Sequence, residues 1–576
     1  GVEGFFAPYV DDILSTMRYL DREHGDGRLF KMFEDSVLAL VVKNYMDYEY
    51  VVGNPPYVRQ ENLRKEDKVL YKEMYPDVYD GRGDISVYFL KRATEFATDE
   101  GRVGFIVSIN FTTSNYGEGI RSYLSDNVTI DEVIDFADTE VFADAIAYPM
   151  IFIFENHPPK ADHQFDYCLI DSGVEGLDNP MAFVFNNVHT DNEHMKSFLV
   201  SQDRLKGDEW RFLPESLFEV TEKIYDRATH SVEGVGRVVT GIRPGLNDAF
   251  ILDEEVAEKH GIEPPVLKEC IKAKDTERYH IPNCSRRVIY TPILDPQLHT
   301  NAFEYISGFE EELKNREQFK NRDDMEWWEI EQPVSPDVFE RKKLITPAFS
   351  KRNRFAYDDR NLYHVDMVMS ILLNQRYESD EAYFHLLAIL NSKTVEIVFK
   401  QSATLIQGKY YRYYRQQINP LPLVFPDDDF EPSLARLAET AIESRKTAEH
   451  LAEFPGPYLS DFEGEIEYIS HTWQSRRYPV NAEFQSIDNG LFSVNAGRTD
   501  SITGPQIDSE ERARYVHAAV DGRNVKSGEE QTIPIPRRDD DVSELLAEWE
   551  EDRATVEETD IAELEAEIDE IVYDLF

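Results

Sequence analysis

The sequence has few cysteines and no cysteine motif. Its 3 cysteines, Cys168, Cys270 and Cys284, are an odd number and lack C-x-x-C spacing. This pattern argues against a disulfide framework and against a zinc site, and it is typical of a reducing compartment. The histidines have neither the paired spacing of a metal site nor a recognisable Ser-His-Asp arrangement, so we predict no metal.

Long apolar runs are also lacking. No window approaches the roughly 18 to 20 apolar residues that a membrane span needs, and the N-terminus has no basic region followed by an apolar core. We therefore expect a cytoplasmic protein without a membrane partner. The sequence begins with Gly1 and not with methionine, which suggests a fragment of a longer chain.

Basic residues are scarce relative to acidic ones. Lys and Arg total 61 against 111 Asp and Glu, which gives a formal net charge of -50. Self-repulsion on this scale destabilises a compact fold in dilute buffer, and concentrated salt screens it, so the composition indicates a halophilic protein. The charge makes nucleic-acid binding less expected without excluding it, because a basic groove can lie between acidic flanks.

The hydrophobic pattern indicates several domains. The chain has 576 residues, 41% of them hydrophobic, and its length suggests about three or four domains. From Tyr48 to about Pro158, short β-rich runs alternate with helical ones, which predicts an α/β sheet covered by helices and closed by a hairpin. The expected elements are a helix at 84–97 and strands at 48–52, 103–109, 133–136 and 150–155.

The composition changes after residues 157–160. Turn-rich sequence with strand-like patches predicts a second, α+β body, and acidic helical stretches follow it. In the tail, apolar residues at helical spacing predict an amphipathic helix or hairpin that packs within the chain: Ile561, Leu564, Ile568, Ile571 and Leu575. We place the three predicted domains at 1–160, 205–425 and 427–576.

One short motif carries chemistry. In YEYVVGNPPYVR (48–59), an apolar run ends in glycine, Asn54, two prolines and Tyr57. Consecutive prolines fix φ and keep the preceding residue extended, so Asn54 is held at the carboxyl edge of a strand, where open α/β sheets bind ligands. The Asn54 side chain offers an acceptor oxygen, Pro56 has no N–H, and the Pro55 carbonyl is left as a second acceptor.

This arrangement suits the exocyclic amine of a nucleobase. The amine lone pair is delocalised into the base, and two acceptors that hold both protons favour a tetrahedral nitrogen whose lone pair can attack an electrophile. The base must leave the duplex, and stacking on the Tyr57 ring offsets part of the unstacking cost, which is roughly a few kcal/mol. An ordinary turn is the alternative for such a tetrapeptide.

The motif NPPY at 54–57 resembles the catalytic motif of the amino-methyltransferases, in the variant typical of DNA adenine-N6 enzymes. In order and spacing, NPPYVRQENL, GDISVYFLKRATEF, GRVGFIVSINFTTSNYGEGIRSYL and VIDFADTEVF are similar to the large methylases of type IIG restriction-modification systems and their phage-exclusion relatives. Later segments, such as 240–254 and 410–423, resemble their target-recognition region, so the resemblance covers most of the chain.

The resemblance implies a fold. It implies a Rossmann-like S-adenosylmethionine-dependent methyltransferase sheet, truncated at its N-terminus, followed by an α+β target-recognition domain and a helical tail. It also implies that Asn54 and the Pro55 carbonyl hold an adenine amine, with Pro56 and Tyr57 completing the motif.

Further roles follow from the resemblance alone. Phe89 and Asp35 would contact S-adenosylmethionine, and Phe154 would face the flipped base, with Phe152 as the competing residue. For Phe89 and Phe154, packing in the core is the alternative.

The sequence departs from the family in one respect. The glycine-rich cofactor loop that precedes the catalytic strand is absent from residues 1–47. We therefore expect the chain as given to bind cofactor poorly or not at all, with the missing segment either removed or on another polypeptide. No PD-(D/E)xK signature is found, so cleavage is not predicted and a nuclease would have to lie upstream.

Basic and aromatic residues interleave at 407–415, QGKYYRYYR, in an otherwise very acidic chain. Such residues are suited to phosphate contacts with double-stranded DNA, and a salt-bridged surface is the alternative. The run KRNR at 351–354 is a further phosphate candidate, with solubility as its alternative. The predicted DNA-binding residues are Arg243, Lys272, Lys274, Arg278, Lys409, Tyr410, Arg412 and Arg415.

The sequence thus predicts a site-specific, adenine-specific DNA methyltransferase. One alternative is a non-catalytic DNA-recognition fragment or a subunit of a restriction endonuclease. Methylation of RNA or of protein glutamine, which also uses an N-P-P-Y type site, is less favoured because the long recognition region is similar to that of DNA enzymes.

Overall fold

The structure is a computed structural model. Before residue 47 it describes only residues 15, 16, 18, 19, 22 and 31. From residue 47 to 576 it describes the chain except for these positions: 59–61, 138, 140–147, 171–173, 175–181, 183, 185–191, 193, 206–208, 323, 404, 407–409, 427–431, 475–479, 497–499 and 505–506.

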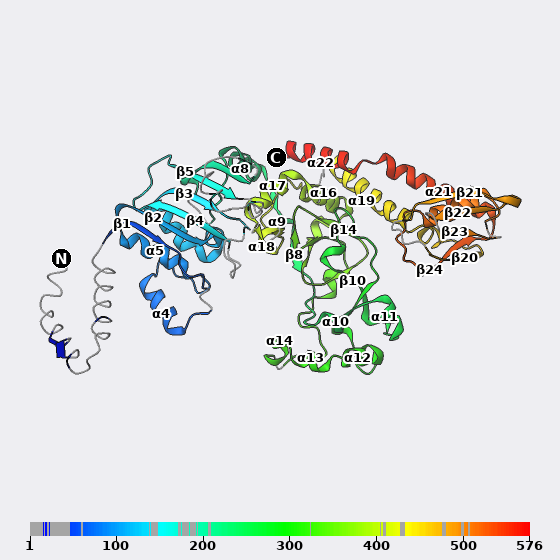
Figure 1. The fold of residues 1–576 in the computed structure, drawn as a ribbon, viewed down its shortest axis with the longest axis horizontal. Coiled ribbons are helices and arrows are strands. Elements are labelled where there is room, and N and C mark those ends of the chain that lie inside the picture. The colour runs from blue at the N-terminus through cyan, green and yellow to red at the C-terminus, as the bar shows by residue number, and fades with distance from the viewer. Residues whose placement is uncertain are drawn as a thin grey trace. The chain divides into compact units, whose positions relative to one another are not determined.

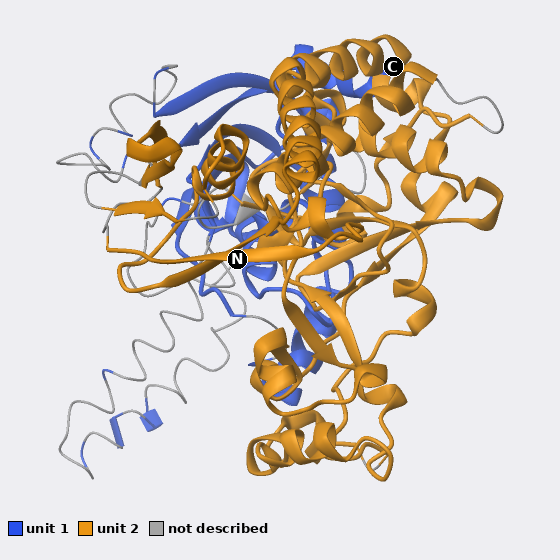
Figure 2. Cartoon of the chain, turned by 90° about the vertical axis from the view of Figure 1, so that its right-hand side faces the viewer, with its two compact units in different colours: residues 1–223, 404–409 blue, residues 224–403, 410–576 orange. Residues whose placement is uncertain are grey.

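The chain divides into two compact units (Figure 2). Unit 1 comprises Gly1–Lys223 and Thr404–Lys409, and unit 2 comprises Ile224–Ala403 and Tyr410–Phe576. Each unit has a hydrophobic core of its own.

Unit 1 is built on a six-stranded sheet in the order β1-β2-β4-β3-β5-β6 (Figure 1). β1 is parallel to β2, and β4 runs antiparallel between β2 and β3. The carboxyl ends of β1, β2 and β3 therefore share one edge of the sheet. The strands are β1 Tyr48–Gly53, β2 Ala97–Ser108, β3 Thr129–Asp135, β4 Pro149–Glu155, β5 Gln164–Ile170 and β6 Met195–Ser201.

Helices pack on this sheet through apolar residues at helical spacing. α5 (Ser86–Phe96) follows Asp84, whose side chain accepts a hydrogen bond from the Ser86 N–H at 2.9 Å. Leu90 of α5 lies fully buried in the same core cluster as Val103 of β2 and Leu124 of α6. Two further helices of this unit are α4 Lys65–Met74 and α6 Glu118–Asn127.

The predicted fold class, a mixed α/β sheet covered by helices, is confirmed. The expected strands correspond to β1, β2, β3 and β4, and the expected helix to α5. The sheet runs on past residue 160, where we placed the end of the first domain, because β5 pairs with β3 and β6 pairs with β5.

Unit 2 begins with two four-stranded sheets, in the orders β15-β10-β11-β9 and β14-β12-β16-β8. In the second sheet every residue of the central strands β12 and β16 is buried, whereas β10 and β11 of the first sheet are buried only at their last two residues. The strands are β8 Gly236–Thr240, β9 Ile251–Asp253, β10 Leu267–Ile271, β11 Arg286–Ile289, β12 Lys343–Pro347, β14 Ala356–Asp358, β15 Tyr363–His364 and β16 Val368–Leu373.

A helical layer closes the core of unit 2. The hydroxyl of Ser379 caps α16 by accepting the Ala382 N–H at 3.2 Å. The tail helix α22 buries Ile568 in this core, with the other members of the predicted apolar stripe packed around it, so its packing within the chain is confirmed. The helices of this layer are α16 Asp380–Asn391, α17 Lys393–Ser402, α19 Pro432–Ala452 and α22 Ile561–Leu575.

Residues 427–576 are helical only in part, which corrects the prediction of a helical region. Between α19 and α21 (Asp539–Glu558) lie two small antiparallel sheets and α20 (Glu510–Val520). Their strands mostly face water; β20, for example, has Ile469 as its single fully buried residue, so apolar alternation is weak. The strands are β20 Ile466–Thr472, β21 Ala482–Ser486, β22 Phe492–Ala496, β23 Asp500–Thr503 and β24 Glu530–Pro536.

Within the part of the chain that the structure describes, no helix combines the length and the apolar composition that a membrane crossing demands.

Candidate active site and nucleic-acid interface

The NPPY motif directly follows β1 at the carboxyl edge of the unit 1 sheet. Gly53, the last residue of β1, pairs with Phe105 of β2. A Cβ atom at Gly53 would lie 3.0 Å from Cε1 of the Phe105 ring, so glycine lets this ring pack against the strand end. Asn54 is exposed and Pro55 is buried, which leaves the amide side chain facing outward from a fixed backbone.

Hydrogen bonds fix the turn that contains Tyr57. The Val58 N–H donates to the Pro56 carbonyl at 3.2 Å, and the Ile85 N–H donates to the Val58 carbonyl at 3.0 Å. The half-buried Tyr57 donates its hydroxyl hydrogen to the Ile106 carbonyl of β2 at 3.3 Å. The motif is thereby tied to both β2 and the start of α5.

The Tyr57 hydroxyl stays protonated over the whole neutral range. Burial, and after it the negative charge of Asp84, raises the pKa of Tyr57 to about 12. The hydroxyl therefore remains a donor to Ile106 and does not act as a base.

Two acceptor oxygens of the NPPY motif have no described hydrogen-bond donor: the Asn54 side-chain oxygen and the Pro55 carbonyl oxygen. Among the residues that the structure describes, none donates a hydrogen bond to the Asn54 side chain or to the Pro55 carbonyl. Because Pro56 has no N–H, no backbone donor is available in the motif to occupy them. This arrangement can accept two hydrogen bonds from one NH2 group.

The predicted cofactor contacts are placed only in part. Phe89 lies on α5 and is 40% exposed, while its neighbours Tyr88 and Leu90 are buried. The Phe89 ring is thus open to a planar ligand and does not belong to the core. Asp35 lies outside the described residues.

The structure places Phe154 and Phe152 in the core, which corrects the prediction of a base contact for Phe154. Both residues have 0% exposure, and their ring centroids lie 5.3 Å apart. Phe152 also packs against Phe111 and Trp210. Residues two apart on a strand share a face, and the face of β4 that carries both phenylalanines is covered.

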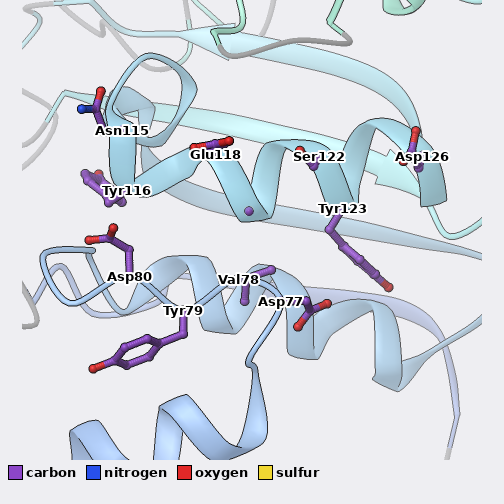
Figure 3. Close-up of a pocket in the computed structure, with 11 residues that line it drawn as sticks. Asp77, Val78, Tyr79, Asp80, Asn115, Tyr116, Glu118, Ser122, Tyr123 and Asp126 are labelled. Atoms are coloured by element: carbon purple, nitrogen blue, oxygen red, sulfur yellow. The ribbon is translucent and has the colours of Figure 1, made fainter.

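A cavity of about 510 Å³ lies elsewhere in unit 1, between the loop after α4 and the turn that leads into α6 (Figure 3). A Cβ atom at Gly119 would lie 2.5 Å from the Asp77 carbonyl oxygen, so glycine allows this close approach. Four carboxylates line the cavity: Asp77, Asp80, Glu118 and Asp126. Their charge disfavours phosphate groups, and none of the predicted site residues lies there.

Three of the predicted DNA-binding arginines have partners within the protein. Arg243 Nε lies 3.6 Å from Asp366 Oδ2, and Arg278 Nε lies 3.0 Å from Glu565 Oε1. Arg415 donates from Nε to the Val238 carbonyl at 2.9 Å. These interactions favour structural roles for the three side chains.

Among the described residues, the other predicted DNA-binding cations form no ion pair. Lys272 precedes a short 3-10 turn (Ala273–Asp275) that contains Lys274, and Tyr410 and Arg412 lie on β18 (Tyr410–Arg412). None of the three cations forms an ion pair with a described carboxylate. Lys409 lies outside the described residues.

Strand pairing brings the KRNR run next to β18. β13 (Phe349–Ser350) pairs with β18, so that Phe349 faces Arg412. Lys351 Nζ lies 5.1 Å from the centre of the exposed Tyr410 ring. The sequence marked both segments as phosphate candidates, but only the pairing of β13 with β18 joins them.

No group of three or more potential metal ligands is found among the described residues.

Two family models match the chain. The model of the Eco57I restriction-modification methylase matches residues 12–142, and that of the TaqI-like C-terminal specificity domain matches residues 299–423. The first match contains the NPPY motif, and the second contains KRNR and β18.

Curated relatives and a solved structure are similar to this chain. Type II methyltransferase M.BstVI of Geobacillus stearothermophilus is 26% identical over 443 residues, 74% of either chain. Type II methyltransferase M.XhoI of Xanthomonas vasicola is 21% identical over 450 residues, 77% of this chain and 80% of that protein. The structure of the type IIL restriction-modification enzyme MmeI with DNA is 12% identical, with a TM-score of 0.46, and covers 88% of this chain. The present chain spans 57% of the length of that structure.

Proposed function

Because this chain carries an Eco57I-type restriction-modification methylase region and, after it, a TaqI-like specificity domain, we propose that it is a site-specific DNA methyltransferase of a restriction-modification or phage-defence system. The reaction that we propose is methyl transfer from S-adenosylmethionine to the N6 amine of a flipped adenine in double-stranded DNA. The observation that supports it most is the fixed position of Asn54 and Pro55, whose oxygens lie unused at the carboxyl edge of the sheet.

In this proposal Asn54 and Pro55 hold the amine. The Asn54 side-chain oxygen accepts one N–H and the Pro55 carbonyl accepts the other. Both bonds draw the nitrogen towards a tetrahedral geometry, in which its lone pair is no longer shared with the purine ring. The buried Pro55 and its neighbour Pro56 fix the backbone, so that little reorganisation is needed when the amine arrives.

Tyr57 supplies the stacking surface. Its hydroxyl is bonded to the Ile106 carbonyl, which restricts the orientation of the ring. Stacking of a base on an aromatic ring contributes about 1 to 3 kcal/mol and offsets part of the cost of extruding the adenine. With its pKa near 12, the Tyr57 hydroxyl takes no proton from the amine.

S-Adenosylmethionine would supply an electrophilic methyl group. Of the described residues, the open ring of Phe89 fits a contact with the cofactor adenine. The described part of the chain contains no glycine-rich backbone cradle after a strand, so it does not form a complete cofactor site. The residues of this chain bind the amine through Asn54 and Pro55 and stack on the base through Tyr57.

The test is Asn54→Ala in the native full-length polypeptide. Methyl transfer from labelled S-adenosylmethionine to duplex DNA should fall at least about 100-fold, because one of the two acceptors is lost in the transition state. Sequence-specific DNA binding should be unchanged. Glu49→Ala, an exposed carboxylate on β1, is the matched control and should retain activity. Full methyl transfer by Asn54→Ala would contradict the assigned role.

A second candidate function is DNA recognition without chemistry, because no glycine-rich cradle for S-adenosylmethionine is found among the described residues. Equilibrium binding of labelled S-adenosylmethionine separates the two. If the native full-length polypeptide binds no cofactor and still binds specific DNA, recognition as a fragment or subunit of a restriction endonuclease replaces methylation.

A further inference from the structure

Six cations of unit 2 form a group without ion pairs, although the protein carries a large excess of carboxylates. We call them, together with Tyr410, the basic patch. No described carboxylate forms an ion pair with any of them. The six cations are Lys272, Lys274, Lys351, Arg352, Arg354 and Arg412.

Three segments that are distant in the sequence build the basic patch. The β13–β18 pairing places the turn 351–354 beside Tyr410 and Arg412. The Tyr410 ring lies 5.1 Å from Lys351 Nζ. On the other side of the turn, Arg354 Nη2 donates to the Ala273 carbonyl at 3.3 Å, and Ala273 lies between Lys272 and Lys274.

Two carboxylates beside the patch have other partners, and a third, Glu277, acts on Arg354 by its charge and pairs with Arg445. Asp275 accepts hydrogen bonds from the Lys272 backbone N–H, at 2.7 Å, and from the Arg286 guanidinium. Glu396 accepts the Asn353 backbone N–H at 3.0 Å and pairs with Lys400. The charge of the patch is therefore not neutralised by these two groups.

The patch also contains donors without acceptors. The Nε atoms of Arg354 and Arg412 are buried and have no hydrogen-bond partner. Lys274, Lys351 and Arg352 are exposed. Repulsion among six cations without ion pairs has an electrostatic cost, which a bound polyanion would remove.

We propose that the basic patch binds the phosphate backbone of the target DNA and does not read its bases. This inference rests on the proposed function and specifies which surface of the proposed specificity domain contacts the DNA. Exposed lysines on flexible side chains act as point charges towards phosphates, whereas base readout needs side chains fixed in a groove. Tyr410 lies against the Lys351 ammonium and helps to orient it over the patch.

The test compares two triple variants of the full-length protein that remove the same charge. The patch variant is Lys274→Ala with Lys351→Ala and Arg352→Ala. The control is Lys526→Ala with Arg537→Ala and Arg538→Ala, which removes exposed cations of the C-terminal region. DNA affinity is measured against salt concentration, with a specific duplex and a scrambled duplex, while circular dichroism checks that both variants are folded.

Each phosphate contact contributes about 0.9 to the slope of log affinity against log salt. The patch variant should therefore lose about 2.7 of the wild-type slope, with an equal loss of affinity for both duplexes, because backbone contacts carry no sequence information. The control variant should keep the wild-type slope. An equal slope in the two variants would overturn the proposal, and so would a loss confined to the specific duplex.

Methyl transfer to duplex DNA separates this inference from the proposed function. The patch variant should need a higher DNA concentration for half-maximal methyl transfer, because its phosphate contacts are lost. If the wild-type protein shows no salt-dependent binding to duplex DNA, the proposed function fails together with the patch. If the wild-type protein binds and methylates normally but the patch variant matches the control, only the patch fails.

Discussion

Replacing Lys343 by methionine should strongly destabilise unit 2. Lys343 Nζ lies 2.5 Å from Asp358 Oδ2, and both side chains are fully buried. Lys343 also donates to the Phe339 carbonyl at 2.7 Å, and Asp358 accepts the Arg360 and Leu362 N–H groups. At this separation and an effective dielectric constant of about 20, the attraction is about 7 kcal/mol before the desolvation cost is subtracted.

Breaking such a pair leaves the remaining charge buried, and we expect Lys343→Met to lower the free energy of unfolding by about 3 to 5 kcal/mol. The adjacent lysine provides a matched control. Lys342 Nζ lies 2.6 Å from Asp380 Oδ1, but the two side chains are 47% and 49% exposed, so Lys342→Met should cost no more than about 1 kcal/mol.

The assay is urea unfolding, monitored by hydrogen exchange of the β12 and β14 amides, because these amides report on unit 2 directly. The double variant Lys343→Met with Asp358→Asn should recover at least about 1 kcal/mol relative to Lys343→Met, because it removes the orphaned carboxylate. Equal destabilisation by Lys343→Met and Lys342→Met would refute the reasoning from burial.

Two further predictions concern Tyr57 of the NPPY motif and His364 of unit 2. Tyr57→Ala should reduce kcat/KM for duplex DNA by about 5- to 150-fold, because the stacking surface is lost. Tyr57→Phe loses only one hydrogen bond of 3.3 Å and should reduce kcat/KM less than about 10-fold. Equal losses of kcat/KM for the two variants in methyl-transfer assays would assign the effect to the hydroxyl. Burial, and then the charge of Lys343, lowers the pKa of His364 to about 3, so the folded state requires the neutral ring. The contribution of the neutral His364 to stability is complete above about pH 6.5 and falls by about 1.4 kcal/mol per pH unit below it. Urea unfolding between pH 7 and pH 5 should therefore show a weaker pH dependence for His364→Gln than for the wild type.

Part of the geometry of the candidate site is local and could be predicted from the sequence. The prolines at 55 and 56 restrict their own backbone and that of Asn54, so the strand edge and its free oxygens follow from neighbouring residues. The alternation of β1, α5 and β2 likewise follows from periodicity within short windows. The weakly apolar strands β20 to β24 carry no such signal, and they were missed.

Periodicity could not assign Phe154. It correctly puts Phe152 and Phe154 on one face of β4, but whether that face meets a ligand or the core depends on what packs against it. Trp210 and Phe111, which cover Phe152, come from other segments of the chain. The composition predicts adaptation to concentrated salt, and no feature of the fold tests that prediction.

The sequence by itself determined the position of the NPPY motif after a strand, the order of the α/β elements and the amphipathic tail helix, because each depends on residues close together in the chain. Only the tertiary structure decided which of the predicted DNA-binding cations have a partner within the protein. Glu565 neutralises Arg278, and Val238 accepts a bond from Arg415, whereas the pairing of β13 with β18 gathers unpaired cations into one surface. Charge compensation acts through space, so it becomes visible only when distant segments have been folded together.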